Sequence, residues 1–89
     1  MVKELTLENP ITTTTDKVTI VLFNDDFNTF DWVIKSLVDV CEHSTIQAEQ
    51  CAMIVHFKGK YPVKSGAKEK LVPMCEALLD RGLSAQISQ

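Results

Sequence analysis

Two stretches in which apolar residues recur at helical spacing follow each other almost without a break, and this arrangement constrains the fold more than any other feature. The first stretch covers residues 30–41 and the second covers residues 44–58. The second begins with a capping box, Ser44 to Gln47, in which the serine caps the new helix and the glutamine can reach back. It closes at Gly59, a usual residue just past a helix C-terminus. The pattern predicts two separate, consecutive helices.

Strand-like segments lie on both sides of this helix pair. Residues 17–23 (KVTIVLF) are β-branched and aromatic, and residues 83–87 alternate like a half-buried strand. Residues 60–64 form a shorter candidate, which Pro62 would confine to a sheet edge or a bulge. We therefore expect three strands, one before the helix pair and two after it.

A third helix is expected between the last two strands. Ser65-Gly66 is predicted to be a turn ahead of it, and Arg81-Gly82 gives a clean stop. Pro73 is awkward inside a helix because it lacks an N–H, so either the helix kinks or the preceding segment is a separate turn. The apolar positions at helical spacing are Leu71, Met74, Cys75, Leu78 and Leu79.

The order strand, helix, helix, strand, helix, strand indicates an α+β fold. The 89 residues allow a single domain, and the economical arrangement is a small three-stranded antiparallel sheet packed against three helices. Residues 1–16 show no sustained periodicity and are predicted to be a flexible N-terminal extension. Residues 17–89 form the predicted core domain.

Composition excludes several classes of function. A formal net charge of −3 argues against nucleic acid as a partner, because phosphate binding needs a basic surface. No apolar run approaches the ~18–20 residues of a membrane span, and the N-terminus lacks a secretory apolar region. The three cysteines include no Cys-x-x-Cys pair, so we expect buried thiols in a reducing, cytoplasmic setting and no zinc site.

Two polar features interrupt the apolar pattern. Asn24-Asp25-Asp26 follows the first strand, where short polar side chains favour a turn by bonding to nearby backbone groups. His56 lies in an otherwise apolar stretch of the second helix, where a histidine is most often a core or boundary residue with one satisfied nitrogen. Both features therefore have a purely structural interpretation.

Three kinds of chemistry compete with that interpretation. A metal site could use Asp25, Asp26 and His56, but their spacing is not local and no ligand pair stands at i, i+4. A hydrolase built on Cys51 and His56 would use residues that do not share one helix face, without an oxyanion-donor signature. A cation site would use asparagine, aspartate and neutral imidazole acceptors. The apolar cavity beside such a site would be formed by Phe30, Val33 and Ala52.

Residues 21–33 (VLFNDDFNTFDWV) and residues 52–59 (AMIVHFKG) together resemble the ClpS family. Its members are N-end rule adaptors that bring substrates to AAA+ unfoldases such as ClpA or ClpC, which act with the protease ClpP. The similarity covers residues 17–88, and the two motifs keep the family's relative spacing. The resemblance implies a non-enzymatic adaptor without a cofactor or metal, which binds substrates whose first residue is Leu, Phe, Tyr or Trp.

The resemblance also implies a set of site residues. The α-amine of the substrate would be held by Asn24, Asp25 and His56. The hydrophobic pocket would be formed by Phe30, Val33, Ala52, Met53 and Ala85. Lys70 is the best match for a family lysine that contacts the N-terminal domain of the unfoldase, and residues 1–16 resemble the extension that engages the unfoldase during delivery.

The chain departs from the family turn, which commonly reads Asn-Asp-Asp-Tyr-Thr-Pro-Met. Phe27 lacks the tyrosine hydroxyl, and Thr29 replaces a proline that would pre-set the helix start. Phe30 stands where relatives place a gating methionine, and Ala52 stands where many carry methionine or leucine. Volume is thus added on one wall and removed from another, which leaves open whether the pocket takes Trp or prefers Leu.

Two other functions stay open at this point. The first is a non-degron protein-interaction module of the same sandwich fold, similar to the C-terminal domain of the ribosomal stalk protein. That domain lacks the Asn-Asp-Asp cluster and its histidine partner. The second is a small metallohydrolase. Neither nucleic acid nor a membrane is expected as a partner.

Overall fold

The computed structural model describes residues 17–89, so the predicted extension at residues 1–16 lies outside the described residues. The elements are β1 (Lys17–Phe23), α2 (Phe30–Cys41), α3 (Thr45–Lys58), β2 (Lys60–Ala67), α4 (Lys68–Asp80) and β3 (Ser84–Ser88). The three strands form an antiparallel sheet in the order β2-β1-β3. The predicted α+β class and element order are confirmed.

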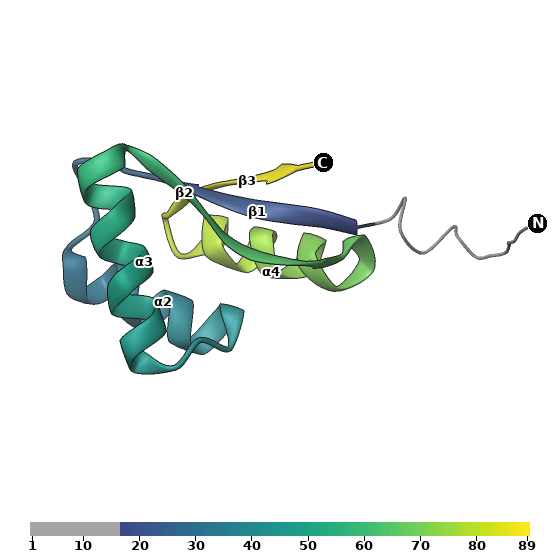
Figure 1. Cartoon of the computed structure of the whole chain (residues 1–89), viewed down its shortest axis with the longest axis horizontal. Coiled ribbons are helices and arrows are strands. Elements are labelled where there is room, and N and C mark those ends of the chain that lie inside the picture. The colour runs from purple at the N-terminus through teal and green to yellow at the C-terminus, as the bar shows by residue number, and fades with distance from the viewer. Residues whose placement is uncertain (1–16) are drawn as a thin grey trace, which may run out of the picture.

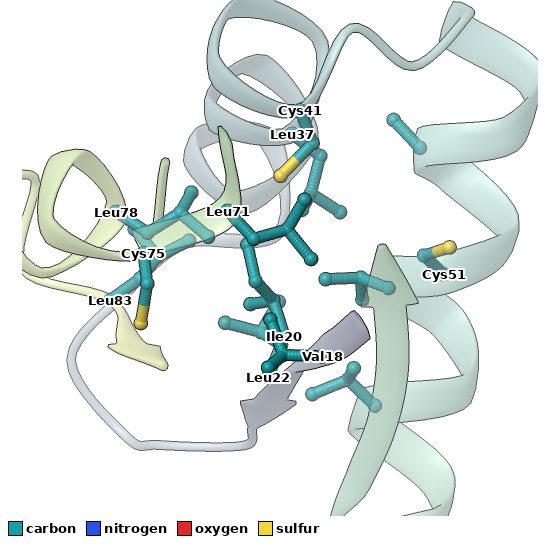
Figure 2. Packing of buried hydrophobic residues seen from close by; sticks show 13 residues of the cluster. Val18, Ile20, Leu22, Leu37, Cys41, Cys51, Leu71, Cys75, Leu78 and Leu83 are labelled. Atoms are coloured by element: carbon teal, nitrogen blue, oxygen red, sulfur yellow. The ribbon is translucent and has the colours of Figure 1, made fainter. Parts of the chain in front are cut away.

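The helices cover one face of the sheet. Figure 1 shows α4 lying along the sheet, with α2 and α3 together near the end at which β1 finishes. Side chains of β1 alternate between faces, and those turned toward the helices are buried. Figure 2 shows these β1 side chains gathered with residues of α4 and α2 in one core. They are Val18, Ile20 and Leu22 of β1, with Leu71, Cys75 and Leu78 of α4 and Leu37 and Cys41 of α2.

Side chains cap both consecutive helices. Thr29 caps α2, and its Oγ1 accepts from the backbone N–H of Trp32 at 3.1 Å. Ser44 Oγ accepts from the backbone N–H of Gln47 at 3.1 Å and caps α3. Gly59 ends α3 at φ 92°, a left-handed conformation that glycine adopts without a steric penalty. The N-termini of both helices and the C-terminus of α3 are therefore fixed locally.

The prediction of a turn at Ser65-Gly66 is wrong, because β2 continues to Ala67. The first residues of β1 supply pairing partners for this longer strand, with Val18 opposite Gly66. A Cβ at Gly66 would lie 3.1 Å from a methyl group of Leu71, so the glycine permits a close approach of α4. Glycine here serves packing within a strand, a use that the turn rules do not capture.

Pro62 lies where it was expected, on an edge strand and at an irregularity. The register of β1 against β2 shifts between Ile20 and Val21, whose partners are Lys64 and Pro62. Residue 63 is thus the extra residue of a bulge. An edge strand tolerates the missing N–H of proline because one side of its backbone has no neighbour in the sheet.

Pro73 lies inside a continuous α4, so the segment before it is not a separate turn. Proline has no N–H to donate to the carbonyl four residues earlier, which belongs to Glu69. Both residues are exposed, so water can satisfy that carbonyl.

The three cysteines are free and buried, as predicted. Burial raises the pKa of the Cys41 thiol to about 11, and it also raises the pKa of Cys51 and Cys75. Thiols of this kind are poor nucleophiles at neutral pH. None of the helices within residues 17–89 has the length and apolar character that a bilayer crossing requires.

Candidate functional site

A backbone hydrogen bond joins the end of β1 to the end of α3. The N–H of Asn24 donates to the carbonyl of Gly59 at 2.8 Å. The N–H of Gly59 in turn donates to the carbonyl of Val55 at 2.8 Å, which closes the last turn of α3. The polar loop after β1 is therefore held beside the helical turn that carries His56.

A pocket of about 310 Å³ opens at this junction. Such a volume lies at the lower end of the range for ligand pockets. Its walls come from the end of β1, the following loop, α2, α3 and the residue before β3. The lining residues are Leu22, Phe23, Asn24, Asp25, Asn28, Phe30, Val33, Ala52, Val55, His56 and Leu83.

Asp25 forms the centre of the polar wall. Its Oδ1 accepts from the backbone N–H groups of Phe27 and Asn28, both at 2.9 Å. Its Oδ2 accepts from Nδ2 of Asn28 at 2.8 Å and from the hydroxyl of Ser84 at 3.3 Å. A carboxylate offers about four acceptor positions, so these four donors occupy the side chain. Asp25 therefore organises the loop with its own hydrogen bonds.

The charge of Asp25 is retained in the folded protein. Burial alone would raise the pKa of Asp25, but the hydrogen bonds from Asn28, Phe27 and Ser84 outweigh burial and lower it. The carboxylate is consequently ionised at neutral pH and gives the pocket a negative charge.

Asn24 and His56 are the more accessible polar residues of the lining. Both are exposed, which makes the structural interpretation of His56 as a core or boundary histidine wrong. The ring of His56 lies edge-on to the ring of Phe57, with centroids 5.2 Å apart and planes at 69°. The acceptors of Asn24 and His56 can therefore be reached by a ligand that enters from solvent.

The apolar wall combines an exposed aromatic ring with buried small residues. Phe30, in the first turn of α2, keeps 42% of its surface exposed, whereas Ala52 on α3 keeps 3%. Val33 lies half-buried one turn after Phe30. A bulky side chain thus stands at the open side of the pocket, and an alanine leaves space deeper inside.

Six of the eight residues predicted for the amine site and the pocket line this one cavity: Asn24, Asp25, Phe30, Val33, Ala52 and His56. Met53 and Ala85 are not among its lining residues. Met53 is 49% exposed on α3, and Ala85 lies opposite Leu22 and packs against the core. Lys70 lies on α4 and forms an exposed ion pair with Glu42 at 3.6 Å. The roles predicted for these three residues stay predictions.

The structure adds lining residues that the sequence did not single out. Leu83 reaches the pocket because the turn between α4 and β3 is tied to the loop after β1 and to α2. Trp32 Nε1 donates to the carbonyl of Arg81 at 3.0 Å, and Asn28 Nδ2 donates to the carbonyl of Gly82 at 2.9 Å. The spacing of Asp25 and Asn28 is typical of a side chain bonded to its own turn, and this signal points to Asn28. No comparable local signal identifies Leu83.

The arrangement of these groups suits the recognition of a small cation beside an apolar group. Within residues 17–89, no set of three or more His, Cys, Asp and Glu side chains is grouped to hold a metal ion. The pocket instead combines an ionised carboxylate, an accessible amide and an accessible imidazole with an apolar wall.

Comparisons with known proteins agree with the fold and the family. Residues 13–86 match the family described as "ATP-dependent Clp protease adaptor protein ClpS". A solved structure of Agrobacterium tumefaciens ClpS2 bound to L-phenylalaninamide is similar in fold, with a TM-score of 0.70 and 18% sequence identity. The similarity covers 82% of this chain and 98% of that one. No curated protein matches the chain.

Proposed function

Since the chain belongs to the ClpS family of Clp protease adaptors, we propose that its pocket captures the N-terminal residue of a substrate protein. The observation that carries this proposal is that Asn24, Asp25 and His56 line one cavity together with apolar side chains. The substrates are proteins whose first residue is bulky and hydrophobic, namely Leu, Phe, Tyr or Trp. The chain acts by binding and needs no catalytic step.

The polar wall is suited to an α-ammonium group. This group carries a positive charge and several N–H donors, whereas an internal peptide amide is neutral and has a single donor. The side-chain oxygen of Asn24 and a neutral ring nitrogen of His56 accept hydrogen bonds from the ammonium. Asp25, whose own acceptors are engaged, contributes its negative charge. The pocket thereby selects a chain terminus over an internal segment.

The apolar wall receives the first side chain. Burying a side chain the size of leucine or phenylalanine is worth ~1.5–3 kcal/mol. Hydrogen bonds to a charged group contribute ~1.5–3 kcal/mol each. Micromolar affinity corresponds to about 8 kcal/mol, so two such bonds, one buried side chain and a few backbone contacts suffice.

The solved ClpS2 structure supports this proposal by its ligand. L-phenylalaninamide has a free α-amine and a large apolar side chain, which are the two groups that the pocket of this chain is suited to hold. The identity of 18% does not carry that ligand over to this chain. The match between ligand chemistry and pocket chemistry makes it a reasonable first probe.

The decisive experiment compares one fluorescent Leu-initiated peptide with its N-acetylated form by anisotropy. Acetylation removes the charge and two donors but leaves the side chain unchanged, so we expect it to abolish measurable binding. His56→Ala and Asn24→Ala should each lower the affinity for the free-amine peptide roughly tenfold, which is the effect of losing one hydrogen bond to a charged group. Ser44→Ala, which removes the cap of α3 far from the pocket, is the matched control and should bind normally. Equal binding of both peptides would refute the proposal.

Delivery to an unfoldase is the second half of the proposed function. The partner is the N-terminal domain of a ClpA- or ClpC-type unfoldase acting with ClpP, and Lys70 is the proposed contact. Lys70→Glu should reduce degradation of a Leu-initiated reporter by the complete protease while leaving peptide affinity unchanged. Lys35→Glu, an exposed lysine of α2, serves as the charge-matched control. Unchanged degradation with Lys70→Glu would remove Lys70 from the interface.

A further inference from the structure

Asn28 connects the loop after β1 to the turn before β3. Its side-chain amide donates to Asp25 Oδ2 at 2.8 Å and to the carbonyl of Gly82 at 2.9 Å. Its backbone N–H donates to Asp25 Oδ1 at 2.9 Å. An asparagine amide has two N–H donors, and both are used, so the side chain is held in a single orientation.

The bond to Gly82 is one of several that fasten the turn between α4 and β3 and the start of β3 to the loop after β1 and to α2. Trp32 donates to the carbonyl of Arg81, and the hydroxyl of Ser84 donates to Asp25. The Asn28 side chain bonds both to Asp25 in the loop after β1 and to Gly82 in the turn before β3. Loss of its amide would remove one of the two donors to Oδ2 of Asp25 and would also release the carbonyl of Gly82.

We infer that Asn28 is a positioning residue of the amine site: by fixing the Asp25 carboxylate and anchoring its loop to the turn before β3, it holds the polar wall in the shape that receives an ammonium group. The inference rests on the proposed function and adds a residue to it. The family turn commonly has threonine at this position, and a threonine hydroxyl has a single donor, so it could form only one of the two side-chain bonds.

Two variants and a matched control test the inference with the same pair of peptides. Asn28→Ala removes both side-chain bonds, and we expect the affinity for the free-amine Leu-initiated peptide to fall roughly tenfold. Asn28→Thr can keep one bond and should fall by about threefold. Ser44→Ala removes a comparable side-chain bond at the cap of α3, and it should bind as the wild type does even where its thermal stability is lower.

The second readout is the titration of the Asp25 carboxyl carbon, followed by NMR. A positioning role requires the pKa of Asp25 to rise in Asn28→Ala, because a donor that lowers it is lost. A merely structural role would lower stability without moving this pKa more than Ser44→Ala does. The titration reports on the bridge whether or not a peptide binds.

The outcomes separate the two proposals. The inference is overturned if Asn28→Ala binds the free-amine peptide with wild-type affinity or loses no more affinity than Ser44→Ala does. In that case the proposed function still stands, provided that the wild type prefers the free-amine peptide to the acetylated one. If the wild type binds both peptides equally, the proposed function fails, and an unchanged Asp25 titration in Asn28→Ala would then overturn the positioning role as well. Should Asn28→Ala not fold, the graded effect of Asn28→Thr decides.

Discussion

The backbone N–H of Asn24 lies 2.8 Å from the carbonyl of Gly59, and this bond continues the pairing of Phe23 with Lys60 and holds the polar loop after β1 beside the last turn of α3. Each residue terminates a regular element, so the bond fixes where β1 and α3 end relative to each other. His56 precedes Gly59 by less than one helical turn and is carried to the same place. The geometry of the site thus depends on how α3 stops.

Replacement of Gly59 by alanine tests this dependence. A Cβ at Gly59 would meet open space, so the cost is backbone strain at φ 92°, about 1–2 kcal/mol. We expect the free energy of unfolding in urea to fall by that amount and the affinity for a Leu-initiated peptide to fall severalfold. Lys58→Ala, at the neighbouring exposed position, should change neither quantity by much. Wild-type stability in Gly59→Ala would show that the left-handed turn is not required.

The proposed role of His56 as a neutral acceptor predicts a pH dependence of binding. A protonated imidazole has no acceptor nitrogen and places a second positive charge beside the ammonium. Affinity for a free-amine peptide should therefore be lower at pH 5 than at pH 7.5, measured by anisotropy at constant ionic strength. Asp25 stays ionised through this range because its pKa is lowered, so its charge does not contribute to the change.

The matched variant for this pH effect is His56→Asn, which keeps an acceptor that does not titrate. We expect weaker binding than in the wild type but little difference between pH 5 and pH 7.5. The chain has one other histidine, His43, which is buried outside the pocket lining. Equal wild-type affinity at both pH values would count against a neutral imidazole acceptor.

The contrast between Phe30 and Ala52 predicts the size preference of the pocket. Ala52 is buried, so Ala52→Leu adds volume inside the cavity with little room for relaxation. Binding of Trp- and Tyr-initiated peptides should fall by at least about tenfold, and binding of the Leu-initiated peptide by only a few fold. Gln50→Leu, an exposed position on α3, controls for the added leucine. An equal loss for all three peptides would contradict a volume effect. Binding of Val- and Ile-initiated peptides by the wild type as tightly as the Leu-initiated peptide would show that the pocket does not discriminate.

Local chemistry explains why much of the fold could be predicted from the sequence. The cap at Ser44 acts within one helical turn, so its signal is complete in a short stretch of chain. The turn wrongly expected at Gly66 shows the limit, because the reason for that glycine is a contact with Leu71 on another element. Position along the chain did not reveal this contact.

The same distinction applies to the candidate site. The residues that carry a motif, Asn24, Asp25 and His56, could be selected from a resemblance and from their acceptor chemistry. Leu83 could not, because it reaches the pocket through hydrogen bonds between segments far apart in sequence. The engagement of all four acceptor positions of Asp25 also became visible only in three dimensions.

The environment of the second histidine, His43, predicts how the stability of the fold depends on pH. His43 is 4% exposed, and its Nε2 lies 2.8 Å from the carbonyl of Val63, which can only accept, so Nε2 carries the proton. Its Nδ1 is buried and has no partner among the described residues. Protonation would place a charge at this unpartnered nitrogen. The neutral ring is therefore the form that the folded chain accommodates.

Burial lowers the pKa of His43 and Lys64 adds to the effect, although the bond to the Val63 carbonyl opposes them. The unfolded chain then takes up a proton at a higher pH than the folded chain does, so the free energy of unfolding must decrease as pH falls below about 6.5. Urea denaturation at pH 7.5, 6 and 5 should show this decrease. His43→Gln, which keeps a donor for Val63 but does not titrate, should lose much of the slope, whereas His56→Asn should retain it. The same slope in His43→Gln and in the wild type would place the pH sensitivity elsewhere in the chain.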